Sequence, residues 1–257
     1  MTAKTASLYN KVFEKIEELT APLIEKNITT DFETGLLPVL RTKFRSIIGC
    51  FFHYCSNILK WIRVNGYIRH YRKSTNYKRC VRRFLALALL PLEVTTAHFE
   101  ELVELCPRSM APFIDYYRRQ WLGNVQPCEW NVYNELHRTN NGTEGKLLRV
   151  TCSFVQFSYH AGWHNRLNRL TKKRNCNVWV ILTILAEEAI AAAANERKVR
   201  LGEKVNRQQV KYIKANRSIE KALTSYYEVL APRPLNHILT TLDTLANCLL
   251  DFKVFNK

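Results

Sequence analysis

The stretch that most constrains the fold covers residues 31–55, DFETGLLPVLRTKFRSIIGCFFHYC. Together with the segment just before it, this stretch predicts short strands over residues 27–30 and 46–50 from β-favouring and apolar runs, and helices over residues 32–44 and 52–64 from the positions of apolar residues. Pro38 fits the first of these helices only if that helix starts late or kinks. In alternating layers of strands and helices, ligands bind beyond the carboxyl ends of strands. Asp31, placed at such an end, is therefore a candidate metal-binding carboxylate.

The rest of the chain has the pattern of amphipathic helices separated by short turns marked by proline. These helices are predicted over residues 7–19, 92–105, 110–122, 176–199, 210–230 and 235–252. The pattern favours a mixed α/β fold that is predominantly α-helical, with a compact helical module over residues 65–137.

The charge of the chain points to a polyanionic partner. Lys and Arg number 39 against 22 Asp and Glu, for a formal net charge of +17. DNA or RNA is the simplest partner for such a charge, although a basic protein that never meets nucleic acid stays an alternative. No secretory signal is visible, and the most apolar run, 178–194, is interrupted by Glu187 and Glu188. We therefore expect a nuclear or cytoplasmic protein that is not secreted and has no membrane span, with reduced cysteines.

A basic and aromatic stretch over residues 61–83 is the candidate nucleic-acid-binding segment. Its proposed phosphate contacts are Arg69, Arg72, Lys73, Arg82 and Arg83. Cations interleaved with tyrosines are typical of surfaces that track phosphates and stack bases. A solvated helix face with its tyrosines packed at the edge fits the same pattern, and the sequence leaves the two readings open.

Four sequence blocks, in order, carry a resemblance to a known family. They are residues 4–19 ahead of ITTDFETG at 28–35, IIGCFFHYCSNI at 47–58, LALALLPLEVTTAHFEELVE at 85–104 with FIDYYRRQW at 113–121, and RTNNGTEG at 138–145, which WHNRLNRL at 163–170 continues. Together they resemble the C-terminal part of the transposase domain of Mutator-like elements (MULE).

The resemblance implies a ribonuclease H-like core in which three carboxylates, Asp-Asp-Glu, hold two Mg²⁺ or Mn²⁺ ions for DNA cleavage and strand transfer. Asp31 corresponds to the second acid and Glu144 to the third. Cys50 and His53 correspond to the Cys-x-x-His signature of the family. Other roles stay open: Asp31 as the N-cap of the predicted helix 32–44, and Glu144 as an ordinary acid at a helix start. Cys50, His53 and Cys55 are too crowded for one tetrahedral zinc site.

Two departures from the family pattern shape the expected function. No Asp precedes Asp31, so the first acid is missing and we expect a truncated, catalytically inactive remnant that holds no metal stably. Residues 146–162 interrupt the family pattern and would be either a retained intron or a genuine insertion. The expected division is a partial ribonuclease H-like core (1–64), a helical insertion (65–137), a third-acid segment (138–200) and a C-terminal helical region (201–257). The alternative function is a non-catalytic, basic nucleic-acid-binding protein.

Overall fold

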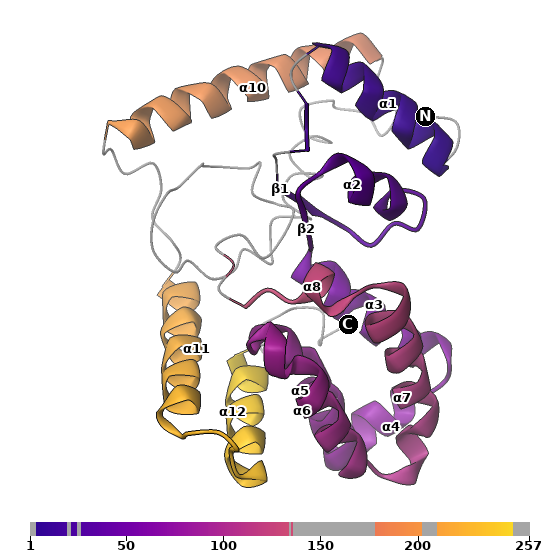
Figure 1. Ribbon diagram of the computed structural model, residues 1–257, viewed down its shortest axis with the longest axis vertical. Helices are drawn as coiled ribbons and strands as arrows, with labels where there is room; N and C mark the ends of the chain where they lie inside the picture. The colour runs from indigo at the N-terminus through magenta and orange to yellow at the C-terminus, as the bar shows by residue number, and fades with distance from the viewer. Residues whose placement is uncertain are drawn as a thin grey trace.

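The computed structural model describes residues 4–19, 22–24, 27–133, 135, 178–201 and 210–248. Over these residues the chain is predominantly helical and contains one two-stranded parallel sheet. Figure 1 shows the sheet with α1 and α2 in the upper part of the view, and a helical body below it that contains α3 to α8. The long helices α11 and α12 lie beside that body.

The sheet and its connecting helix form a βαβ unit near the start of the chain. Strand β1 (Asn27–Thr30) pairs in parallel with β2 (Ser46–Gly49), and Thr30 is in register with Gly49. Helix α2 (Leu37–Lys43) makes the crossover between them, as parallel pairing requires. The first helix, α1 (Ala6–Leu19), covers this unit through an edge-to-face contact of Phe13 with Phe44, with ring centroids 5.6 Å apart.

The crossover helix begins later than the sequence pattern predicts. Residues 34–36 form a turn in which the amides of Leu36 and Leu37 both donate to the carbonyl oxygen of Glu33, at 3.0 and 3.1 Å. Pro38 occupies the second position of the helix, where its missing N–H costs no hydrogen bond. Leu36 is the N-cap residue, so the interpretation of Asp31 as an N-cap is wrong.

Short turns link the remaining helices. Their bounds are α3 Phe51–Val64, α4 Ile68–Lys73, α5 Thr75–Ala86, η1 Leu87–Leu89, α6 Leu92–Glu104, η2 Arg108–Met110, α7 Ala111–Tyr117, η3 Arg118–Asn124, α8 Pro127–Trp130, α10 Val178–Arg200, α11 Val210–Glu228 and α12 Leu235–Cys248. The helix predicted over residues 110–122 is divided, because the π-helical turn η3 follows α7. The other predicted helices agree with the structure to within a few residues wherever it describes them.

The core is built mainly from aromatic side chains. Tyr54 of α3 is fully buried, and its ring stacks on that of Trp130 with centroids 5.1 Å apart. Its hydroxyl group lies 2.6 Å from that of Tyr117 and donates to the carbonyl oxygen of Phe84 at 3.0 Å. Buried hydroxyl groups need such partners, and these hydrogen bonds fix the positions of α3, α5 and α7 relative to one another.

Helices α11 and α12 pack on the body through polar as well as apolar contacts. Tyr226 of α11 is buried, and its hydroxyl lies 2.8 Å from Nε2 of His98 on α6. Arg83 of α5 donates from Nε and Nη2 to the two carboxylate oxygens of Asp243 on α12, both at 2.6 Å. Among the described residues, no helix has the length and apolar character that crossing a membrane would require.

Candidate nucleic-acid interface

Asp31 and Cys50 lie at the same end of the parallel sheet. The amide of Cys50 donates to the carbonyl oxygen of Thr30 at 2.6 Å, one step beyond the register pair of Thr30 and Gly49. Asp31 directly follows Thr30 and is half-buried, whereas Cys50 is fully buried at the N-terminus of α3. The carboxyl end of the sheet thus brings two of the predicted site residues together, in the position where α/β layers bind ligands.

The acid nearest to Asp31 in sequence is held by the N-terminal segment. Glu33 accepts hydrogen bonds from the Tyr9 hydroxyl and from Nζ of Lys4, the latter at 2.9 Å. The bonds from Tyr9 and Lys4 lower the pKa of Glu33. The hydrogen bond to Glu33 raises the pKa of Lys4, and the charge of Asp31 adds a smaller effect. Glu33, two residues after Asp31, therefore already has a cation beside it.

Of the other predicted site residues, Glu144 lies outside the described residues, as does the segment 146–162. His53 is half-buried in the first turn of α3 and contacts the ring of Phe52 edge to face, with centroids 5.5 Å apart. Burial raises the pKa of the Cys55 thiol and so favours the protonated form, which binds metal poorly. Within the described part of the chain, no three potential metal ligands among His, Cys, Asp and Glu come together.

The strongest feature of the described structure is a surface with an excess of cations. Between residues 34 and 92 the sequence has twelve Lys and Arg and no Asp or Glu. Seven of those cations lie on α4 and α5. Because these two helices contain no carboxylate, partners for their cations must come from elsewhere in the chain or from a ligand.

The five cations expected from the sequence to bind nucleic acid fall into two groups. Arg69, Arg72 and Lys73 are exposed, and Arg82 is half-buried. Arg83 is only 8% exposed and forms the ion pair with Asp243. The structure thus gives Arg83 a role in packing α12 on α5, and the other four remain on the surface.

The tyrosines of the same stretch pack inside the protein. Tyr71 and Tyr77 are buried, and Tyr67 stacks on Trp61 with ring centroids 5.6 Å apart. Trp61 also stacks on Tyr116, with ring centroids 4.6 Å apart. Since these ring faces are used within the protein, they are not available for stacking on bases. The structure therefore favours phosphate contacts over base stacking as the chemistry of this surface.

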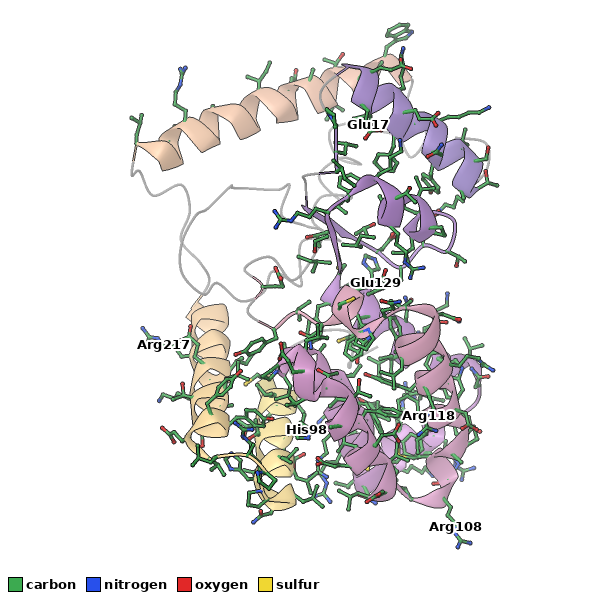
Figure 2. All side chains as sticks on the ribbon, viewed as in Figure 1. Glu17, His98, Arg108, Arg118, Glu129 and Arg217 are labelled. Carbon is green, nitrogen blue, oxygen red and sulfur yellow. The ribbon has the colours of Figure 1, made fainter. Side chains whose placement is uncertain are left out.

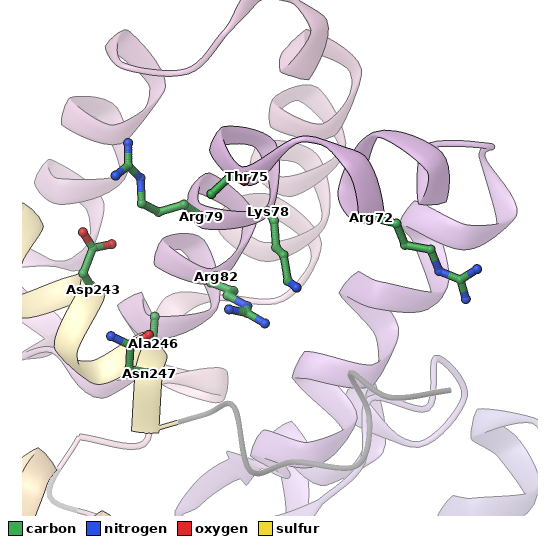
Figure 3. Close-up of a pocket in the computed structure, with 8 residues that line it drawn as sticks. All are labelled: Arg72, Thr75, Lys78, Arg79, Arg82, Asp243, Ala246 and Asn247. Atoms are coloured by element: carbon green, nitrogen blue, oxygen red, sulfur yellow. The ribbon is translucent and has the colours of Figure 1, made fainter.

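Three further side chains belong to the cation-rich surface of α4 and α5. Thr75, Lys78 and Arg79 line a pocket of about 390 Å³ together with Arg72 and Arg82. Asp243, Ala246 and Asn247 of α12 form its other wall, as Figure 3 shows. Residues 75, 78, 79 and 82 have the i, i+3, i+4, i+7 spacing of one helix face, and this signal would have found them.

In the described part of the chain, Arg72, Lys78 and Arg79 form no ion pair. The one carboxylate in the pocket lining, that of Asp243, has both oxygens bonded to Arg83. The pocket is therefore positively charged and suited to an anion that carries several oxygen acceptors. Comparison of the chain with known protein families, with curated proteins and with solved structures finds no match.

Proposed function

We propose that this protein binds nucleic acid, DNA in the first place, through the phosphate groups, and that α4 and α5 form the interface. The observation that carries the proposal is the exposed excess of cations on these two helices, which contain no carboxylate. Each cation that contacts a phosphate releases condensed counterions, which makes such binding strong at low salt and largely independent of sequence. Because the tyrosines of this stretch pack inside the protein, we expect no preference for single strands through base stacking.

We further propose that the chain derives from a MULE transposase domain. The parallel βαβ unit with Asp31 and Cys50 at its carboxyl end is what a partial ribonuclease H-like core would contain. If the ancestral Mg²⁺ or Mn²⁺ ions were bound, Asp31 and Glu144 would be among their carboxylate ligands. The nucleic-acid binding proposed above uses neither of these carboxylates.

The proposal is tested by the salt dependence of DNA binding. A 25-base-pair duplex with a fluorescent label is titrated with the full chain between about 50 and 200 mM salt, and anisotropy is measured. The test variant is R69Q/R72Q/K73Q/R82Q. Its matched control, R108Q/R119Q/R217Q/K221Q, removes the same charge at exposed positions away from α4 and α5. Figure 2 labels Arg108 and Arg217, which lie on the η2 turn and on α11.

We expect the test variant to bind at least about tenfold more weakly at low salt. Its slope of log K against log salt should be less steep by about 3, because up to four phosphate contacts are lost. The control should keep most of the affinity and the slope. Asp31→Ala should bind as the unmodified chain does, since binding does not use the strand end. Equal losses in the test variant and the control would overturn the proposal, because net charge alone would then explain binding.

A further inference from the structure

We propose that the pocket between α4, α5 and α12 receives the terminal phosphomonoester of a nucleic-acid strand, a ligand distinct from the internal phosphates that the open surface contacts. The inference rests on the proposed function, because it names the part of the nucleic acid that this portion of the interface recognises. The pocket volume of about 390 Å³ falls at the lower end of the range for small-ligand sites.

One of the lining cations contacts the ring of a buried tyrosine. Lys78 Nζ lies 6.0 Å from the centroid of the Tyr71 ring, in a cation–π contact. Burial raises the pKa of Tyr71, and the neighbouring Arg82 acts in the opposite direction. Figure 3 shows the side chains of Lys78 and Arg82 extending in the same direction from α5, one helical turn apart. A ligand oxygen between them would meet two cations that line the pocket from the same helix.

Shape and charge together favour a strand end. An internal phosphodiester carries one negative charge and has a nucleoside on each side, so it offers a concave site less charge and fewer free oxygens. A terminal phosphomonoester carries about −1.5 to −2 charges at pH 7 and three oxygen acceptors, and only one side of it is linked to the strand. The hydroxyl of Thr75 and the amide of Asn247, both in the lining, supply neutral donors for the remaining oxygens.

The experiment compares strand ends on the same duplex. Two 25-base-pair duplexes differ only in carrying 5′-phosphate or 5′-hydroxyl ends, with the label at one 3′ end, and binding is measured at about 150 mM salt. We expect the phosphorylated duplex to bind about tenfold more tightly, from one or two added charge-assisted hydrogen bonds. Lys78→Gln, and separately K78Q/R82Q, should abolish this preference. The matched control R108Q/R119Q, with the same loss of charge, should keep it.

The failures of the two proposals are distinguishable. If both duplexes bind equally and binding still depends on the exposed cations of α4 and α5, the pocket does not recognise strand ends although the proposed function holds. If neither duplex binds, the proposed function fails. A competition experiment then tests which ligand the pocket recognises. A nucleoside 5′-monophosphate, inorganic phosphate and a 5′-hydroxyl strand are each added to the complex with the phosphorylated duplex, at the same millimolar concentration. If the 5′-hydroxyl strand displaces the duplex as well as the two phosphate compounds do, recognition of the phosphomonoester is refuted.

Discussion

Gly49, the last residue of β2, is required by close packing rather than by backbone conformation. A Cβ atom at this position would overlap the ring of Phe32 and would lie 2.6 Å from the carbonyl oxygen of Glu129. The ring of Phe32 is in turn held by Trp121, with centroids 5.0 Å apart and the planes at 88°. Neither neighbour is the mobile end of a long side chain, so neither can move aside without repacking the region where the sheet meets α8 and η3.

Gly49→Ala is therefore expected to destabilise the protein by about 1–3 kcal/mol, the usual cost of overpacking. Urea unfolding followed by circular dichroism measures the change. Gly123→Ala is the matched control, because the nearest atom to its added Cβ would be the Arg118 carbonyl oxygen, at 3.7 Å. If both variants unfold at the same urea concentration as the unmodified chain, the close packing around Gly49 is not a constraint on stability.

Helix α12 depends on a carboxylate that pairs across 160 positions of the chain. Asp243 accepts two hydrogen bonds from Arg83, whose side chain is 9% exposed, while the Asp243 side chain is 35% exposed. Loss of the carboxylate leaves a buried guanidinium without its partner, and this is more costly than loss of a surface ion pair. Because Asp243 also lines the basic pocket, the same change alters one wall of that pocket.

Asp243→Asn should lower the stability by about 1–2 kcal/mol, a value reduced from that of fully buried pairs because Asp243 is partly exposed. Amide hydrogen exchange of residues 235–248 should accelerate more than that of α3, since α12 loses its contact with α5 first. Asp115→Asn, at an exposed position on α7, is the control. Equal exchange of α12 in the variant and in the unmodified chain would show that the ion pair does not hold this helix.

The comparison of elements shows what local patterns can and cannot predict. The spacing of apolar residues predicts α3 and α6 closely, because each of these helices buries one face with a regular period, and short runs of strand-favouring residues predict β1 and β2. The start of α2 was misplaced, since the turn at residues 34–36 depends on Gly35 fitting against the backbone of Lys4. The sequence gives Arg82 and Arg83 the same predicted role, that of a phosphate contact. In the structure Arg83 instead pairs with Asp243, which lies far along the chain. A partner so far along the chain leaves no local signal.

Three ion pairs tie the N-terminal part of the protein together, and all three involve carboxylates with lowered pKa values. Glu17 pairs with Lys43 at 2.6 Å and links α1 to α2. The Glu33 and Lys4 pair links the segment before α1 to the strand end. Glu129 accepts hydrogen bonds from Nε and Nη2 of Arg41, at 2.6 and 2.8 Å, and links α8 to α2. Burial acts to raise the pKa of Glu129, but the bonds from Arg41 and from the Gln126 amide outweigh it.

These pairs make the stability of the whole protein sensitive to acid. Each carboxylate has a pKa in the folded state below its ordinary value of 4.5, so near and below that pH the unfolded chain binds more protons than the folded one. The stabilisation is therefore complete above about pH 5.5 and is lost as the pH falls through the folded-state values. The formal net charge of +17 rises further as carboxylates are protonated, and self-repulsion acts in the same direction.

Thermal unfolding between pH 8 and pH 3 tests this prediction. The midpoint temperature should stay nearly constant from pH 8 to about 5.5 and should fall steeply below pH 4.5. Glu129→Gln should lower the midpoint at pH 7 while making the decline in acid shallower, because one of the three titrating carboxylates is gone. The exposed Glu104→Gln serves as the control and should leave both quantities unchanged. A midpoint that rises between pH 5 and pH 3.5 would mean that these ion pairs do not govern the acid response, and that the lowered pKa values of Glu17, Glu33 and Glu129 contribute no net stability.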